Sequence, residues 1–248
     1  MRYKCIVSYD GTNFHGFQTQ LNSRTVQEEL EKALAIIHKE RINVLACSRT
    51  DSHVHAYGQV IHFDSFLDIN ERNMKQAINS YLPSDIYVKE VIKTDKSFHV
   101  QHNVFEKEYH YLIDLGEYNP LYYNYRMYPE YGTLDVEAMK DASLVFIGEH
   151  DFKTFTKNHE TTNTIKNIKS IDFIIDNNLL TIKFIGNSFL YNMIRIMVAM
   201  LVEVGYHHLT KEDLKAALEA KNRKYAPKLA TANGLYLLRI KYEDEKSE

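Results

Sequence analysis

Alternating apolar and polar residues predict the strands of this chain. From Arg2 to Tyr9 every second side chain is apolar or aromatic, so these side chains would share one face of a strand. Apolar, strand-forming runs predict the remaining strands at 42–47, 58–64, 86–93, 108–115, 168–175, 179–185 and 235–242. The polar residues 176–178 between two of these runs predict a hairpin turn.

Apolar residues at helical spacing predict the helices. Thr25 and Glu28 form a capping-box sequence, in which the threonine hydroxyl and the glutamate carboxylate each accept from a backbone N–H. An apolar helical face follows over 26–37. Further helices are predicted after Asn70 up to Pro83, over 135–147 and over 189–205.

The order of these elements predicts the fold class. Strands and helices are mixed in both halves and include hairpins, which favours an α+β fold over a doubly wound parallel sheet. A chain of 248 residues can hold one large domain or two small ones. No low-complexity linker divides it. We expect a boundary near Val104, between an N-terminal half at 1–104 and a C-terminal half at 105–248.

Composition indicates an ordinary globular protein, with 44% hydrophobic and 25% charged residues. Cys5 and Cys47 both fall in apolar strand-like runs, as buried free thiols in a reducing compartment would. Residues 1–4 lead directly into a strand and have no secretory or transit character. We therefore expect a cytoplasmic protein.

The segment 189–205 is nearly continuously apolar and predicts a helix that ends at Gly205. It is short for a membrane span and contains Asn192, Arg195 and Glu203, so we expect a buried central helix and no membrane contact. Arg195 then needs partners, because an unpaired buried charge costs several kcal/mol. An acid in the core, other hydrogen-bond partners or solvent would each satisfy it.

Polar, potentially reactive side chains are concentrated in residues 48–56, between two predicted strands. Asp51 stands between Arg49, two residues before it, and His53 and His55 after it. Such polar segments are commonly turns, because their side chains hydrogen-bond the local backbone. Alternate positions on an extended segment share a face, so Asp51, His53 and His55 form an alternative metal site. No second cluster of Cys, His or Asp completes its coordination.

The net charge of −3 does not by itself predict nucleic-acid binding, which usually needs a basic excess. Only the surface that meets phosphate has to be positive, however. Candidate contacts are Lys166 with Lys169, and the run of Lys221, Arg223, Lys224 and Lys228. A solvated helix end is the alternative interpretation of that run.

Several motifs, in order along almost the whole chain, resemble those of the tRNA pseudouridine synthase A family. Arg49-Thr50-Asp51 followed by Val54-His55-Ala56 resembles the motif that carries the family's catalytic aspartate. Further segments that resemble family motifs lie at 9–18, 25–28, 98–99, 109–111, 148–152, 193–195 and 233–237. Many matches in the family's order are far more specific than any one of them.

The resemblance implies an RNA pseudouridine synthase, an isomerase that breaks the glycosidic bond of a uridine, turns the uracil and rejoins it through carbon 5. It implies Asp51 as the catalytic carboxylate, Arg195 as its ionic partner and Tyr109 as the aromatic ring beneath the base. Leu235 would wall the pocket against water, and Arg49 would take the place of the flipped nucleotide. The implied fold has two similar α/β halves joined through a mixed, mainly antiparallel sheet, with flanking helices and a central active-site cleft.

The resemblance also implies partners. The expected substrate-binding residues are Arg49, Leu235 and, in a positional role, His55, together with Lys221 and Arg223 from the basic run. The implied substrate is RNA, in particular uridines of the tRNA anticodon stem-loop, bound by a homodimer with RNA crossing both subunits. No metal or organic cofactor is implied.

Some positions depart from the family pattern. Ser48 stands where glycine is usual, and Ser52-His53 replaces Ala-Gly, which costs strain if the lost glycine had a positive φ. Thr19, Gln101 and Asn163 stand where relatives commonly carry arginine, and each lost arginine removes a phosphate contact. These departures leave ribosomal RNA as an alternative substrate, and a catalytically silent RNA-binding protein as an alternative function.

Overall fold

The computed structural model describes residues 1–158 and 160–245. Their contacts divide the chain into two compact units: unit 1 contains Met1–Phe105 and Tyr236–Glu248, and unit 2 contains Glu106–Leu235. The division lies beside the boundary expected near Val104, whereas the C-terminal strand returns to unit 1. Sequence order does not reveal that return, because it depends on pairing between strands far apart in the chain.

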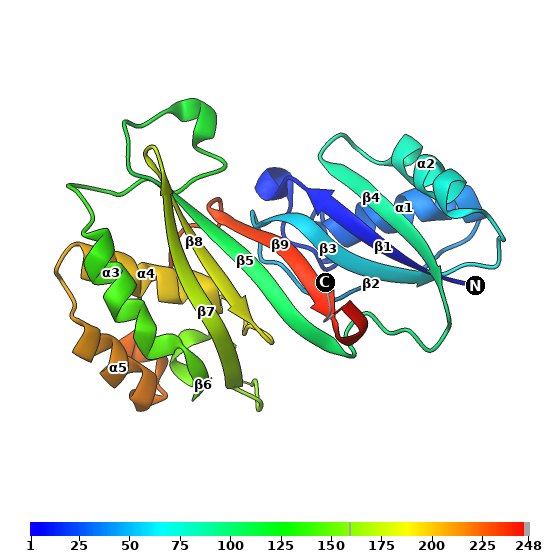
Figure 1. The fold of residues 1–248 in the computed structure, drawn as a ribbon. Coiled ribbons are helices and arrows are strands. Elements are labelled where there is room, and N and C mark those ends of the chain that lie inside the picture. Colours follow the sequence, from blue (N-terminus) through cyan, green and yellow to red (C-terminus); the bar gives the residue numbers. More distant parts are fainter. Residues whose placement is uncertain (159, 246–248) are drawn as a thin grey trace. The chain divides into compact units, whose positions relative to one another are not determined.

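A mainly antiparallel sheet forms the frame of unit 1 (Figure 1). Its strands are β1 (Arg2–Tyr9), β2 (Leu45–Ala46), β3 (His55–Asp64), β4 (Ile86–Thr94) and β9 (Leu235–Tyr242), of which the first residue, Leu235, belongs to unit 2. β1 lies between β3 and β4 and is antiparallel to both, and β2 is antiparallel to β3. β9 joins β3 in parallel, with His55 opposite Tyr236. The polar segment at 48–56 therefore covers most of the connection between β2 and β3 and the first two residues of β3.

The strand predicted over 42–47 is wrong in length, since only Leu45–Ala46 pairs with β3. Side chains of the preceding helix satisfy the backbone instead: Val44 N–H donates to Glu31 at 3.1 Å, and its carbonyl accepts from Gln27 at 3.1 Å. By contrast, β1 has the bounds that alternation predicts, and β9 has the bounds predicted from its apolar run. Alternation succeeds where one face of a strand is buried and the other is not.

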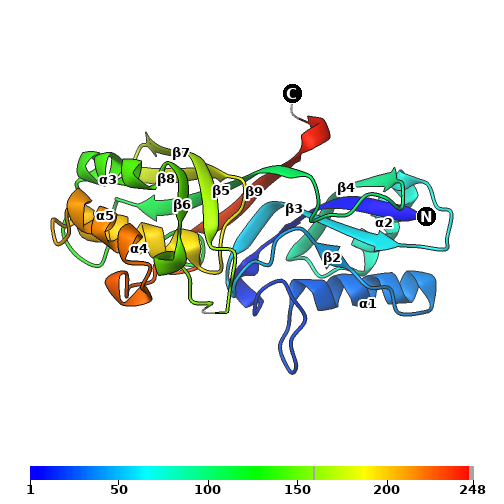
Figure 2. The same cartoon turned by 90° about the horizontal axis from the view of Figure 1, so that it is seen from below.

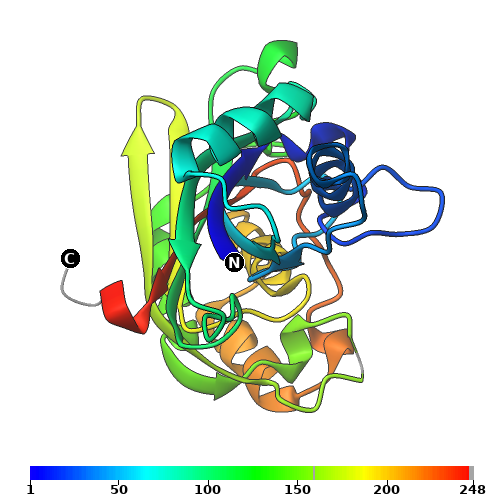
Figure 3. The same ribbon diagram turned by 90° about the vertical axis from the view of Figure 1, so that its right-hand side faces the viewer.

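Two helices, α1 (Val26–His38) and α2 (Glu71–Tyr81), lie side by side in unit 1 (Figure 3). Thr25 caps α1 as predicted, and its hydroxyl accepts from Glu28 N–H at 3.4 Å. The reciprocal half of the predicted capping box is wrong. The Glu28 carboxylate instead pairs with Lys32 Nζ at 2.9 Å, one helical turn further on.

Unit 2 is built on an antiparallel sheet. Its strands are β5 (Val104–Asp114), β6 (Gly148–Asp151), β7 (Ile165–Asp176) and β8 (Leu179–Gly186). β8 lies between β5 and β7, and β6 pairs with β7. The predicted hairpin turn between β7 and β8 is confirmed, with Asn177 at a φ of 55°. Tyr109 on β5 lies opposite Phe184 on β8.

The helices of unit 2 gather on one face of its sheet (Figures 1 and 2). They are α3 (Val136–Ser143), α4 (Met193–Gly205) and α5 (Lys211–Ala220). The predicted start of the long helix at residue 189 is wrong, because Asn192 has a φ of 62°, which is incompatible with a continuous helix. The α-helix predicted over 135–147 ends earlier, at Ser143, and a 3-10 turn at Leu144–Phe146 follows it.

The cores of both units are aromatic. Their largest fully buried rings are Tyr3, Phe14, Phe17 and Phe63 in unit 1, and Tyr111, Phe146, Phe152, Phe155 and Phe184 in unit 2. Burial of one such side chain contributes about 2 kcal/mol, against about 1 kcal/mol for a helix cap or less for a surface ion pair. Core packing therefore decides where the elements lie, and Phe14 and Phe17 anchor the segment on which the polar loop rests.

The α+β class is confirmed. Residues 1–158 and 160–245 form nine strands and five α-helices, and the strand pairs within the units are antiparallel apart from β3 and β9. Cys5 and Cys47 are both buried free thiols, as predicted. In the part of the chain that the structure describes, no helix is both long enough and apolar enough to cross a membrane.

Candidate active site

Two segments singled out in the sequence, 9–18 and 48–56, pack against each other in unit 1. Phe17 N–H donates to the Thr50 carbonyl at 3.1 Å, and His53 N–H donates to the Phe14 carbonyl at 3.1 Å. The hydroxyls of Tyr9 and Thr50 are hydrogen-bonded at 2.7 Å. The loop that carries Asp51 is thus held from both sides by backbone and buried side chains rather than left open to solvent.

Glycine is required where these two segments cross. A Cβ atom at Gly11 would lie 2.2 Å from the Val54 carbonyl oxygen, far inside van der Waals contact. Gly16 has a φ of 94°, and a Cβ there would lie 2.8 Å from the Thr50 carbonyl oxygen. Both glycines let one backbone segment approach another closely. Any other residue at these positions would push the two segments apart.

Buried polar side chains brace the entry to the loop. Gln59 is fully buried on β3; its amide donates to the Ser48 carbonyl at 2.6 Å and accepts from Ser48 N–H at 3.3 Å. Burial raises the pKa of Tyr9 to about 12, against the opposing effect of its hydrogen bond to Thr50, so its hydroxyl stays protonated at neutral pH. Sequence inspection missed Gln59, whose only signal was an amide within an apolar strand.

Asp51 opens a tight turn over residues 51–54. Its backbone carbonyl accepts from Val54 N–H at 3.2 Å, and its side chain is half-buried. His53, the third residue of the turn, has a φ of 64°. The position is one that glycine fills freely and that costs another residue about 1 kcal/mol. The strain expected from replacing a family glycine at His53 therefore has a geometric basis.

Exposure varies from residue to residue along this loop. Arg49 and His53 are exposed, whereas Ser48 and Thr50 are buried. Asp51 therefore lies between two exposed, hydrogen-bonding side chains, one on each side along the chain. Arg49 has the exposure that its predicted contact with RNA requires.

His55 is held inside unit 1, at the start of β3. Its Nδ1 accepts from Gly11 N–H at 3.0 Å, and its ring stacks on Tyr236 with centroids 4.6 Å apart. Asp10 Oδ1 lies 3.2 Å from the same nitrogen. A backbone N–H can only donate, so Nδ1 acts as an acceptor and the approach of Asp10 is not an ion pair. These are the contacts of a positioning residue.

The alternative metal site finds no support. Among residues 1–158 and 160–245, no three His, Cys, Asp or Glu side chains are grouped so that they could hold a metal ion. His53 Nδ1 is bonded to the Thr12 carbonyl at 2.8 Å, and His55 points into the core. The alternation that placed Asp51, His53 and His55 on one face does not apply, because 51–54 is a turn.

In unit 2, Arg195 lies in the first turn of α4 and is half-buried. Its Nε donates to the Ala230 carbonyl at 2.9 Å, while its own carbonyl accepts from Ala230 N–H at 3.1 Å. The expectation that a guanidinium on this helix needs hydrogen-bond partners is confirmed. The contacts also fix the segment after Ala230 against α4.

The same segment reaches β5, the strand that carries Tyr109. The Tyr111 hydroxyl donates to the Thr231 carbonyl at 2.8 Å, and Leu112 N–H donates to the Gly234 carbonyl at 2.8 Å. Burial raises the pKa of Tyr111, and the Arg195 charge acts in the opposite direction. Residues 230–235 thus link Arg195 on α4 to the strand of Tyr109, and they end at Leu235.

Tyr109 and Leu235 are both buried, with exposed fractions of 8% and 6%. The Tyr109 ring meets Phe189 edge to face, with centroids 5.2 Å apart. An aromatic ring and an aliphatic side chain in this setting can form the floor and wall of an apolar pocket. Unit 1 carries Arg49, Asp51 and His55, and unit 2 carries Tyr109, Arg195 and Leu235. Their convergence remains a prediction.

The predicted basic residues are largely paired with acids. Lys221 lies 3.1 Å from Asp151, Lys228 lies 2.6 Å from Glu203, and Lys169 lies 3.1 Å from Glu106. Exposed ion pairs are worth about 0–1 kcal/mol, so the exposed Lys221 can exchange its partner for a phosphate at little cost.

Arg223 is tied to the backbone. Its Nη2 donates to the carbonyls of Pro227 and Lys228 at 3.2 and 3.1 Å, and burial lowers its pKa. Its Nε and Nη1 are buried without a hydrogen-bond partner among the described residues. Burial also lowers the pKa of Lys166, with a smaller contribution from Lys107.

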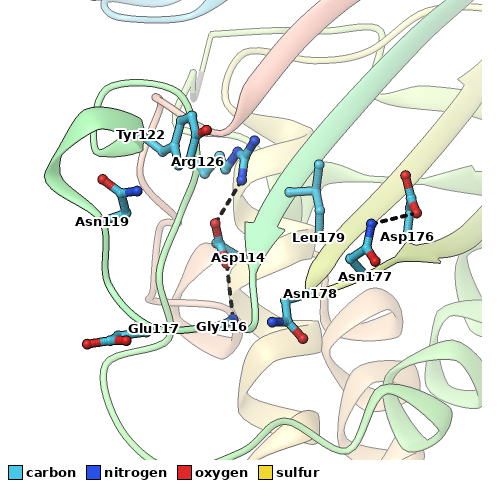
Figure 4. Close-up of a pocket in the computed structure, with 10 residues that line it drawn as sticks. All are labelled: Asp114, Gly116, Glu117, Asn119, Tyr122, Arg126, Asp176, Asn177, Asn178 and Leu179. Carbon is cyan, nitrogen blue, oxygen red and sulfur yellow. Dashed lines mark hydrogen bonds and ion pairs between the residues drawn. The ribbon is translucent and has the colours of Figure 1, made fainter.

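A separate polar cavity of about 360 Å³ lies in unit 2, at the C-terminal end of β5 (Figure 4). Asp114 bridges its floor, accepting from Arg126 Nη1 at 2.9 Å and from Gly116 N–H at 3.0 Å. None of the predicted site residues lines this cavity. Its carboxylates, Asp114, Glu117 and Asp176, outnumber its one arginine, which does not suit an RNA backbone.

Comparisons with known proteins identify the family to which this chain belongs. Residues 5–103 and 142–243 match the family described as tRNA pseudouridine synthase. The tRNA pseudouridine synthase A of Anoxybacillus flavithermus is 43% identical over 245 residues, 98% of this chain and 99% of that protein. That of Bacillus subtilis is 39% identical over 247 residues, 98% of this chain and 100% of that protein.

A solved structure, of a Cbf5-Nop10-Gar1 complex, aligns with 80% of this chain and 54% of its own chain, at a TM-score of 0.35 and 12% identity. That similarity is too low to support an assignment. The family match covers most of the chain, and the two bacterial relatives align with nearly all of it. The chain therefore belongs to the tRNA pseudouridine synthase family.

Proposed function

We propose that this protein isomerises uridine to pseudouridine in tRNA, at the anticodon stem-loop, with Asp51 as the reacting carboxylate. The observation that carries the proposal is the setting of Asp51. It is half-buried at the start of a turn that buried hydrogen bonds and two close-approach glycines hold in place. A carboxylate on a backbone held in this way needs little rearrangement of the loop when a substrate reaches it.

The reaction explains the residues around it. The target uridine leaves its stack, the bond between its nitrogen and the ribose breaks, the uracil turns, and carbon 5 forms the new bond and loses its proton. Arg49, exposed two residues before Asp51, stacks in the space of the flipped nucleotide. His55 positions the loop from within. Lys221 and Arg223 contribute to the hold on RNA, with the exposed Lys221 as the phosphate contact.

Unit 2 supplies the other side of the site. Arg195 pairs with Asp51 and favours its ionised form, Tyr109 stacks beneath the base, and Leu235 excludes water. What supports these roles is the link that residues 230–235 make between α4 and β5, which places all three groups along one connected part of unit 2. The proposal requires Asp51 to meet them around one uridine.

The loss of the proton from carbon 5 provides the test. With tRNA labelled with tritium at carbon 5 of uridine, each turnover releases one tritium to water. Asp51→Asn keeps the size of the side chain and removes its charge, so we expect release to fall at least about 10³-fold. Asp68→Asn is the matched control: the same change in the same unit, at an exposed carboxylate paired with Lys93, and release should stay within twofold. Undiminished release by Asp51→Asn would reject the role of Asp51.

The partnership of Arg195 has its own test. Arg195→Ala should lose most of the activity, and added guanidinium ions should restore part of it by occupying the vacated position. A purely structural role in holding the Ala230 carbonyl would make the variant less stable and leave it beyond rescue. An equal rise in the activity of the wild-type protein, which retains Arg195, would show that the ions act elsewhere.

We propose tRNA rather than ribosomal RNA as the substrate, because the matching family and the bacterial relatives are both named as tRNA pseudouridine synthases. The protein acts in the cytoplasm as a homodimer. Light scattering checks the assembly: a mass near that of one 29.1 kDa chain would contradict the homodimer.

A further inference from the structure

His53 occupies a backbone position that costs it conformational energy beside the reacting carboxylate. It is the third residue of the turn that Asp51 opens, with a φ of 64°. Glycine adopts this conformation freely, and asparagine tolerates it better than most residues. The turn alone would therefore favour glycine or asparagine over histidine at this position. The contacts of the imidazole suggest a role that offsets this cost.

Backbone on both sides fixes the orientation of the imidazole. His53 N–H donates to the Phe14 carbonyl, and ring atom Nδ1 lies 2.8 Å from the Thr12 carbonyl oxygen. A carbonyl can only accept, so Nδ1 carries the hydrogen. Among the residues that the structure describes, no protein group bonds to the other ring nitrogen, Nε2, and the side chain is exposed.

The surroundings of the ring suit an RNA backbone. Arg49, two residues before Asp51, and His53, two residues after it, are both exposed. His15 is exposed as well, and its ring centroid lies 6.4 Å from that of His53. Exposed hydrogen-bonding side chains thus flank Asp51 in the sequence, and a second imidazole lies near that of His53.

We propose that His53 is a substrate-contact residue, which holds a ribose 2′-hydroxyl next to the reacting uridine through Nε2. In its neutral form, an imidazole that donates through Nδ1 has a lone pair on Nε2. The 2′-hydroxyl can donate to that lone pair, and it is the group that distinguishes RNA from DNA. The inference rests on the proposed function, since it assumes that RNA binds over Asp51.

Binding of tRNA, measured by fluorescence anisotropy at pH 8, tests the contact without requiring turnover. His53→Gly and His53→Asn relieve the backbone cost and remove the imidazole, so both should melt at or above the wild-type temperature. Their Kd for tRNA should nevertheless rise about five- to tenfold, the loss expected for one hydrogen bond. At saturating tRNA, kcat should stay within about twofold, because the contact is made before and during the reaction alike.

His207→Gly is the matched control. His207 is also an exposed histidine with a positive φ, of 58°, but it follows α4 in unit 2. Its replacement should change the melting temperature in the same direction and leave the Kd for tRNA unchanged. An unchanged Kd in His53→Gly, with a lower melting temperature, would show that His53 is only a brace between the loop and Thr12.

Substrates with single 2′-deoxy nucleotides identify the group that His53 binds. One such substitution near the target uridine should weaken wild-type binding by the same factor as His53→Gly, and should have no further effect on that variant. Equal effects on both proteins would overturn the assignment to a 2′-hydroxyl. If wild-type protein binds tRNA but releases no tritium, the proposed function fails while the contact stands; if it binds no tRNA, both fail.

Discussion

Substitution of Gly11 by alanine should displace the loop that carries Asp51. The new Cβ would lie 2.2 Å from the Val54 carbonyl oxygen and 2.9 Å from the His53 carbonyl carbon. Both neighbours are backbone atoms, which cannot rotate away as a side chain does. Because ordinary contact begins at 3.4 Å, the two segments must separate by about 1.2 Å. Overpacking of this kind costs about 1–3 kcal/mol of stability.

The same displacement should cost activity. A misplacement of about 1 Å in a reacting group lowers a rate by about 10²-fold, equivalent to about 2.7 kcal/mol of activation free energy. We therefore expect Gly11→Ala to lower kcat/KM for tritium release about 100-fold, with the larger share in kcat. The temperature of the assay is chosen so that circular dichroism shows the variant to be folded.

Gly58→Ala separates lost stability from lost geometry. A Cβ at Gly58 would lie 2.3 Å from the Leu238 carbonyl oxygen, so the clash is equally severe, but it lies between β3 and β9 rather than under the loop. Both variants should lose similar unfolding free energy, and Gly58→Ala should keep kcat/KM within about fivefold of wild type. Equal activities in the two variants would refute the argument that the crossing at Gly11 positions Asp51.

Three further predictions concern stability and access. Burial lowers the pKa of His62 to about 4, so below pH 6.5 the unfolded chain takes up a proton at this residue before the folded protein does. The free energy of unfolding should therefore fall by up to about 3 kcal/mol as the pH drops from 6.5 to 4. In chemical denaturation, His62→Asn should flatten that decline. Thr25→Ala should lose about 1 kcal/mol in the same assay, because it removes the cap of α1, and Thr25→Ser should restore it. Burial raises the pKa of Cys5, and Cys47 is buried as well, so iodoacetamide should label neither thiol until the protein is denatured; labelling of the native protein, measured by mass, would contradict this.

Elements with a one-sided core could be predicted from sequence. The strands β1 and β9 have the expected bounds, because alternate side chains are buried along both. Errors arose where a single residue or side chain decided the outcome. The positive φ of Asn192 makes α4 begin after residue 192. Glu31 accepts the backbone N–H of Val44, which a longer β2 would have used for strand pairing. Lys32 pairs with the Glu28 carboxylate, which therefore does not complete the capping box. α5 was missed although Thr210 and Asp213 form a complete capping box ahead of it.

The sequence singles out candidate site residues, whereas the contacts that support them could not be predicted. The polar loop around Asp51 could be found by composition and by resemblance. Its support could not, because the crossing with 9–18, the brace from Gln59 and the stacking of His55 on Tyr236 are contacts between distant parts of the chain. The φ of His53 is likewise a property of the folded turn.

Mass-spectrometric mapping of pseudouridine in tRNA treated with purified protein tests the assignment of reaction and residue together. With wild-type protein, pseudouridine should form in the anticodon stem-loop, and with Asp51→Asn the same positions should remain uridine. Pseudouridine from Asp51→Asn at the wild-type level, or none from the wild-type protein, would contradict the proposal.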